Sequence, residues 1–277
     1  MDETITTNDT IDQRIAVLQR HKNEWAQLSI DKKISLLETL KHNIDLYASD
    51  WAAAGIKAKN IAAETSGVGE EWISGPWAAL SSVNQLLATL GAMAKGGQRK
   101  PDSVRTRQDG QLVAKIFPLS VFDRLLLNGV SGEVWMQPGV TEDNLSQFTA
   151  GFYQQESPEG VVSLVLGAGN ISSIAPLDVL YKLMAEGRVC LLKMNPVNEY
   201  LGPIFEKIFE PFTQLGFVQF VYGGAHVGEY CTAHEGIDAI HITGSHLTHD
   251  AIVYGVGEEG KKRKLLNDPV LSKPISS

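Results

Sequence analysis

The chain has 277 residues, of which 43% are hydrophobic and 20% are charged, and its formal net charge is −8. This composition is typical of a folded globular protein and excludes both global disorder and a basic surface for nucleic acid. No apolar run approaches the ~20 residues that span a bilayer, and the acidic, polar N-terminus is unlike a signal peptide. The sequence therefore predicts a cytoplasmic protein that binds neither nucleic acid nor membrane.

The first part of the chain divides into three predicted regions. A polar tail at 1–10 precedes a helical region at 11–98, in which apolar residues recur at helical spacing and glycine or proline interrupts the pattern. A strand-containing extension follows at 99–159, with strands predicted at 111–117 and 134–137. The helices are expected to pack against the sheet that the next region predicts.

Residues 160–260 alternate short apolar runs, which predict strands, with amphipathic segments, which predict helices. The predicted strands lie at 162–166, 188–193, 217–222 and 237–242, and the predicted helices at 174–187, 200–216 (with a kink at Pro211), 227–234 and 246–254. Such βα units build a Rossmann-like parallel sheet flanked by helices, so the predicted fold class is α/β. The final region, 261–277, carries the basic cluster KKRK at 261–264 and is predicted to be a solvated linker, with a localisation or anion-binding role as the alternative.

Glycine or asparagine occurs just after three of the four predicted strands. In a parallel sheet, the carboxyl ends of the strands form the crevice in which ligands bind. After the last strand, Thr243-Gly244-Ser245 is predicted to cap a helix, and the unpaired amides at a helix start are suited to a phosphate. We therefore predict a dinucleotide-binding site at this edge of the sheet.

Four motifs resemble, in order and spacing, those of the NAD(P)-dependent aldehyde dehydrogenase superfamily. They are GVVSLVLGAGN at 160–170, MAEGRVCLLK at 184–193, GGAHVG at 223–228 and HEGIDAIHITGS at 234–245. A weaker likeness covers the residues before 160. The resemblance implies the N-terminal, cofactor-binding part of such an enzyme, with NAD or NADP as its cofactor and an aldehyde as its substrate.

The resemblance also implies roles for individual residues. Asn170 would stabilise the substrate oxyanion, Lys193 would contact the cofactor ribose, and the helix start at Ser245 would meet the pyrophosphate. The implied cofactor-binding residues are Lys193, Gly223, Gly224, Gly228, Thr243, Gly244 and Ser245. A β-hairpin near the extension helps to build oligomers in this family, so we expect a homo-oligomer and an exposed apolar edge there.

Two turns depart from the family pattern. GAGN at 167–170 replaces a Pro-Trp-Asn turn, which implies a different substrate mouth, and Lys193 is followed by Met194-Asn195-Pro196 where Pro-Ser-Glu is common. The missing glutamate binds a ribose hydroxyl in the family, so the choice between NAD and NADP stays open, as does that between acid-forming and acylating chemistry. The family's catalytic cysteine and glutamate lie beyond these motifs and are absent, so we expect a truncated chain without dehydrogenase activity of its own.

Cysteines and histidines offer other chemistries. Cys190 lies in an apolar predicted strand and is expected to be a core residue. Cys231 could form a thiolate pair with His234, although the same spacing also describes two ordinary neighbours on a helix face. His246 and His249 lack a third ligand, so no metal site is predicted. Two function classes remain: part of an NAD(P)-dependent aldehyde dehydrogenase, or a non-catalytic nucleotide-binding or interaction module with the same fold.

Overall fold

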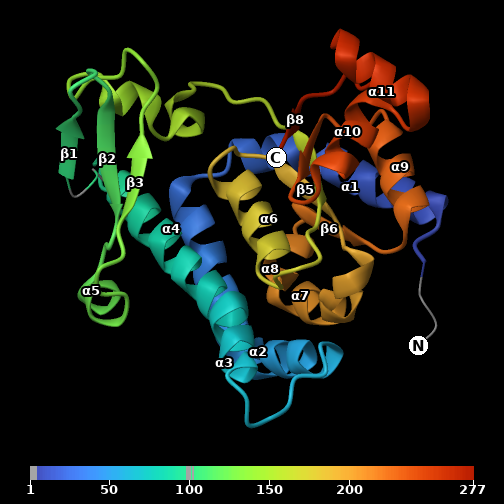
Figure 1. Cartoon of the computed structure of the whole chain (residues 1–277), viewed down its shortest axis with the longest axis horizontal. Helices are drawn as coiled ribbons and strands as arrows, with labels where there is room; N and C mark the ends of the chain where they lie inside the picture. The colour runs from blue at the N-terminus through green and yellow to red at the C-terminus, as the bar shows by residue number, and fades with distance from the viewer. Residues whose placement is uncertain (1–4, 98–100, 102) are drawn as a thin grey trace. The chain divides into compact units, whose positions relative to one another are not determined.

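The computed structural model describes residues 5–97, 101 and 103–277. It divides into two compact units (Figure 1). The sheet unit consists of Met1–Leu87 and Glu156–Ser277 and contains a parallel sheet; the extension unit consists of Ala88–Gln155 and contains an antiparallel sheet. The fold class is therefore α/β, as predicted. The division of the chain into regions that the sequence predicts stays a prediction.

The sheet unit is built around parallel strands in the order β6-β5-β4-β7-β8. They are β4 (Val162–Leu166), β5 (Val189–Lys193), β6 (Val218–Val221), β7 (Ala239–Ile242) and β8 (Ile275–Ser276). The first four match predicted strands, whereas β8 is not predicted, because two residues are too few to show a pattern. Leu166 pairs with both Lys193 and Ile242, so the carboxyl ends of the central strands lie at one edge.

The two central strands are buried on both faces. Every residue of β5 is buried, as are Val162–Val165 of β4, which explains why both strands appear in the sequence as continuous apolar runs. Helices α1 (Asn8–Ala26) and α6 (Ile174–Met184) contact both strands. Helix α6 ends at Met184 with Ala185 as its C-cap residue, and Gly187, which has a φ of 66°, turns the chain towards β5.

The N-terminal region is helical, as predicted. After α1 come α2 (Ile30–Ala58), α3 (Gly67–Trp72), a π turn (Ile73–Trp77) and α4 (Ala78–Ala94). Thr7 and Ser29 cap α1 and α2, because each hydroxyl accepts a hydrogen bond from the backbone amide three residues later. Gly75 leaves helical geometry inside the π turn, at one of the breaks that the sequence predicts. Of the predicted tail, residues 1–4 lie outside the described residues and 8–10 already belong to α1.

The carboxyl-terminal helices differ from the prediction in two places. The helix expected at 200–216 is interrupted, because Pro211 lacks an amide hydrogen and its ring would clash with a helical carbonyl four residues earlier. A 3-10 turn (Pro196–Leu201) is followed by α7 (Gly202–Ile208) and α8 (Glu210–Thr213). The cluster at 261–264 lies in helix α11 (Gly257–Leu266) and not in a linker, with Arg263 and Glu259 paired at 3.5 Å.

The extension unit contains an antiparallel sheet in the order β1-β2-β3. Its elements are β1 (Ser103–Thr106), β2 (Leu112–Phe117), α5 (Val121–Leu126), β3 (Gly132–Trp135) and the 3-10 turns Leu145–Phe148 and Gly151–Gln154. The second predicted strand thus begins earlier than expected, while β1 and α5 are not predicted. Helix α5 buries none of its residues, and its large apolar side chains are 69% to 76% exposed. The exposed apolar edge expected at the hairpin stays a prediction.

Trp51 ties helix α2 to the segment that follows β4. Its Nε1 donates to Ser172 Oγ at 3.0 Å, and both residues are at most 2% exposed. Trp51→Phe would leave the serine hydroxyl buried without its donor, so we expect the free energy of unfolding to fall by about 1–3 kcal/mol. Urea denaturation of this variant, of Ser172→Ala and of the double variant measures the interaction; strictly additive losses would contradict it.

Candidate functional site

The first turn at the carboxyl edge follows β4 and runs from Gly167 to Asn170. The side-chain amide of Asn195 donates to the carbonyl of Gly167, and that of Asn198 donates to the carbonyl of Ala168, both at 3.1 Å. Asn198 is buried. Two side chains from beyond the neighbouring strand therefore hold two successive carbonyls of the turn that carries Asn170.

Lys193 ends β5 and is only 7% exposed. Burial lowers the pKa of its amine, because the charged form is poorly solvated there, while the carboxylate of Glu199 acts in the opposite direction. The amine brings three hydrogen-bond donors to the carboxyl edge of the sheet. A ligand hydroxyl or phosphate is a suitable acceptor for it.

The third turn follows β6 and begins with two glycines. Gly223 has a φ of 127°, a conformation that suits glycine, and its amide donates to Glu199 Oε1 at 2.6 Å. Gly224 precedes helix α9 (Ala225–Ala233) as its N-cap residue. A methyl group added at Gly228, inside α9, would have no neighbour within 4 Å. This face of the helix is therefore open to a ligand.

The fourth turn follows β7 and starts helix α10 (His246–Tyr254). Ser245 caps this helix as predicted, because its Oγ accepts a hydrogen bond from the Leu247 amide at 3.1 Å. A methyl group added at Gly244 would meet only Ile242, at 3.9 Å. The helix start is thus approachable, and its dipole favours an anionic group.

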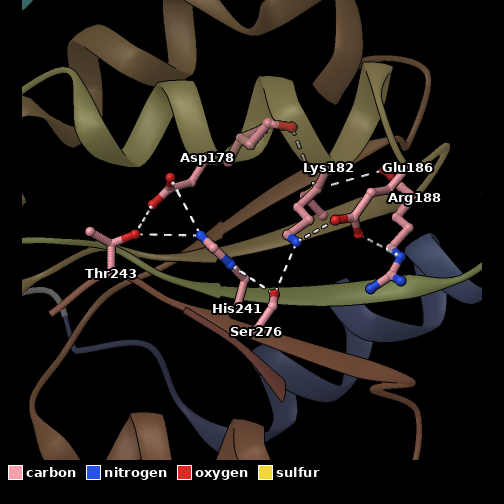
Figure 2. Close-up of polar contacts among 9 residues, drawn as sticks. Asp178, Lys182, Glu186, Arg188, His241, Thr243 and Ser276 are labelled. Carbon is pink, nitrogen blue, oxygen red and sulfur yellow. Dashed lines mark hydrogen bonds and ion pairs between the residues drawn. The ribbon is translucent and has the colours of Figure 1, made fainter. Parts of the chain in front are cut away.

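A row of polar side chains extends from this turn along the sheet (Figure 2). Thr243 Oγ1 donates to Asp178 Oδ2 at 2.8 Å, and His241 Nε2 lies 3.4 Å from Asp178 Oδ1. Ser276 Oγ lies 2.9 Å from His241 Nδ1 and accepts a hydrogen bond from the buried Lys182 at 3.0 Å. The row joins β7, β8 and α6, and it fixes the direction of the Thr243 hydroxyl.

The four turns line one cavity of about 1160 Å³. Every predicted site residue except Gly223 lines it, and the structure therefore brings together Asn170, Lys193, Gly224, Gly228, Thr243, Gly244 and Ser245. Gly223 is not among the lining residues, and its amide is bonded to Glu199 instead. What these residues do toward a ligand stays a prediction.

Sequence reasoning misses three residues that shape this cavity. Asn195 lines it, while Asn198 and Asp178 hold its wall through hydrogen bonds. The dipeptide Asn195-Pro196 is a recognisable helix-start signal, and the Asn195 side chain does cap the 3-10 turn. Its contact with Gly167 joins residues far apart in the sequence and has no local signal.

Both cysteines are buried in the sheet unit. Burial raises the pKa of the Cys190 thiol above its usual range and raises that of Cys231 to about 11. His234 does not pair with Cys231, because its Nε2 lies 3.3 Å from Asp12 and its Nδ1 accepts the Gly236 amide at 2.9 Å. Neither thiol has the environment of an activated nucleophile.

Native thiol labelling should therefore be slow. With a pKa of about 11, roughly one Cys231 in ten thousand is a thiolate at pH 7. We expect a disulfide reagent such as DTNB to modify both cysteines at once in guanidinium chloride and to modify neither rapidly in the folded chain. Rapid labelling of one thiol at pH 7, in a chain that stays folded by circular dichroism, would contradict the buried assignment.

Within the described residues, no group of three or more histidine, cysteine, aspartate or glutamate side chains is arranged to hold a metal ion. Of the two histidines considered from sequence, His249 lies 3.6 Å from Asp250. Among the described helices, none has the length and apolarity needed to cross a membrane.

No protein-family model and no curated protein matches the sequence. Solved structures do match the fold over 98% of this chain. A glyceraldehyde-3-phosphate dehydrogenase from Methanocaldococcus jannaschii, complexed with NADP, has a TM-score of 0.57 at 11% identity, with 46% of its own chain covered. An aldehyde dehydrogenase from Bartonella henselae has a TM-score of 0.57 at 14% identity, with 44% covered. The chain has the aldehyde dehydrogenase fold.

A third match extends the comparison to a protein with a different nucleotide. A Sinorhizobium meliloti protein described as a methylmalonate-semialdehyde dehydrogenase, complexed with NAD, has a TM-score of 0.56 at 9% identity over 98% of this chain. It is covered over 43% of its own length. The chain thus spans less than half the length of these three aldehyde dehydrogenase-fold structures.

Proposed function

We propose that the cavity binds a nicotinamide dinucleotide, NAD or NADP, and that this chain is the cofactor-binding part of an aldehyde-oxidising enzyme. The observation that carries the proposal is the joining of four strand-end turns around one cavity of about 1160 Å³. That volume lies somewhat above the roughly 300–1,000 Å³ typical of ligand pockets, which suits an extended ligand. Structures of the same fold complexed with NADP and with NAD support the choice of ligand.

The residues present fit such a ligand. Gly244 leaves the start of α10 free of side chain, so backbone amides at this helix start, apart from the Leu247 amide that Ser245 already caps, would hold the diphosphate. The Lys193 amine would bond the ribose hydroxyls, and the Asn170 amide would donate to the oxygen of an aldehyde as negative charge develops on it. The bound nicotinamide would supply the hydride acceptor.

A second candidate is a non-catalytic nucleotide-binding or interaction module of the same fold. The observation that favours it is the burial of Cys190 and Cys231, which leaves the described chain without an activated thiol. Both candidates require nucleotide binding. We further propose that the chain forms a homo-oligomer through the extension unit, whose helix α5 exposes its apolar side chains.

Removing the buried amine tests the cofactor site. Lys193→Met keeps the apolar stem, so we expect a folded chain with at least about tenfold weaker NAD or NADP binding by calorimetry. Binding that depends on the charged amine should also weaken as pH rises, starting below the ordinary lysine pKa of 10.5, because burial lowers this pKa. Lys32→Ala, an exposed lysine on α2, is the matched control. Unchanged affinity in the Lys193 variant would contradict the proposed role.

Gly228→Ala separates binding from stability. The added methyl group meets no atom in the free chain and replaces a glycine inside helix α9, so the free energy of unfolding should rise by about 0.5–1 kcal/mol. In the complex the methyl group would stand where a ligand packs, so we expect weaker nucleotide binding in the same titration. Gly91→Ala in α4 has equal space and no place in the cavity lining, and should stabilise without affecting affinity.

A further inference from the structure

We propose that Asn195 and Asn198 are positioning residues that hold the turn after β4 and thereby set where Asn170 lies in the cavity. Both side-chain amides donate to carbonyls of this turn, at 3.1 Å in each case. The proposal rests on the proposed function, because it assigns the placement of one wall of the nucleotide cavity. It concerns the two places where the sequence departs from the family pattern.

Asn195 uses both ends of its amide. Its Oδ1 accepts a hydrogen bond from the Val197 amide at 3.1 Å and so starts the 3-10 turn after β5. Its Nδ2 donates to the Gly167 carbonyl. A carboxylate at this position could accept but not donate, and would face the carbonyl oxygen with negative charge. Only a side chain with both functions joins the two turns in this way.

The two glycines of the first turn leave room that the Asn195 amide and the neighbouring backbone occupy. A methyl group added at Gly169 would lie 2.9–3.1 Å from side-chain atoms of Asn195, and one at Gly167 would lie 3.2 Å from the Lys193 carbonyl oxygen. Any larger residue at Gly169 would therefore push Asn195 aside. The Gly-Ala-Gly turn and the asparagine after Lys193 therefore fit one another sterically.

Asn198 supplies the second anchor, from a buried position in the 3-10 turn. With its donation to Ala168, two successive carbonyls immediately before Gly169 and Asn170 are fixed from outside the turn. A buried carbonyl that lost its donor would seek another partner, so the backbone would shift. Anchoring of this kind holds a binding group in place before the ligand arrives.

Two substitutions at one position separate the donor from the acceptor. Asn195→Asp keeps the acceptor that caps the 3-10 turn and loses the donor to Gly167, whereas Asn195→Ala loses both. Hydrogen exchange of the amides at 167–171 and nucleotide affinity by calorimetry are the two readouts. We expect both variants to speed exchange and to weaken binding by about tenfold. An Asp variant that behaves like the unsubstituted chain, with only the Ala variant impaired, would overturn the proposal.

Asn43→Asp is the matched control. Asn43 also donates its amide to two carbonyls, those of Lys207 at 3.2 Å and Ile208 at 3.3 Å, and it does not line the cavity. Asn43→Asp should leave hydrogen exchange at 167–171 and nucleotide affinity unchanged. If Asn43→Asp had the same effects as Asn195→Asp, loss of any such side-chain amide would speed exchange in the turn, and the proposal would be overturned. If the unsubstituted chain binds neither nucleotide, the proposed function fails while the exchange arm still decides whether the asparagines hold the turn.

A double-mutant cycle between Gly169 and Asn195 is a second test of the proposal. Gly169→Ala alone should speed exchange in the turn, because its methyl group displaces the Asn195 side chain. In the Asn195→Ala background the same change meets no such neighbour and should add little. Equal effects of Gly169→Ala in the two backgrounds would show that the two residues act independently, against the proposal.

Discussion

The structure depends on one constraint. Where parallel strands end together, backbone amides and carbonyls at the shared edge lose the hydrogen-bond partners that a neighbouring strand would give them. Leu166, Lys193 and Ile242 end their strands in register, and the chain must leave the sheet at each of them. Buried amides and carbonyls there need other partners. The residues that follow the strands supply these partners. The need for hydrogen-bond partners at the strand ends therefore determines both which residues form the turns and how those turns shape the cavity.

The turns meet this constraint in two ways, and the difference shapes the cavity wall. After β4 the partners are asparagine side chains from a neighbouring turn, and the wall itself is formed by Gly167, Ala168, Gly169 and Asn170. After β7 the Ser245 side chain caps its own helix and Thr243 is held by Asp178. The lining carries only two charged residues, Lys193 and Glu229. Recognition of an anionic ligand would therefore come mainly from backbone amides and helix dipoles.

Much of this arrangement could be predicted from sequence, because strands buried on both faces appear as continuous apolar runs and the strand-end rule places the residues after them together. That reasoning brings Asn170, Lys193 and Ser245 to one cavity. Contacts between distant residues could not be predicted, since nothing near Asn195 specifies Gly167 and nothing near Asp178 specifies Thr243. Helix α11 could not be predicted for another reason. Its sequence has no apolar stripe, and its side chains form ion pairs between residues three or four positions apart instead.

The short strand β8 has a consequence for the edge of the sheet. Only Ile275 and Ser276 pair with β7, and side-chain bonds from Ser276 to His241 and Lys182 add to the attachment of the strand. Loss of those polar bonds would weaken the attachment of this strand. Its departure would bare the ladder groups of β7, and an unpaired strand edge is a template for the strand of another molecule. The polar row beside the cavity thus also helps to hold β8 along the edge of β7.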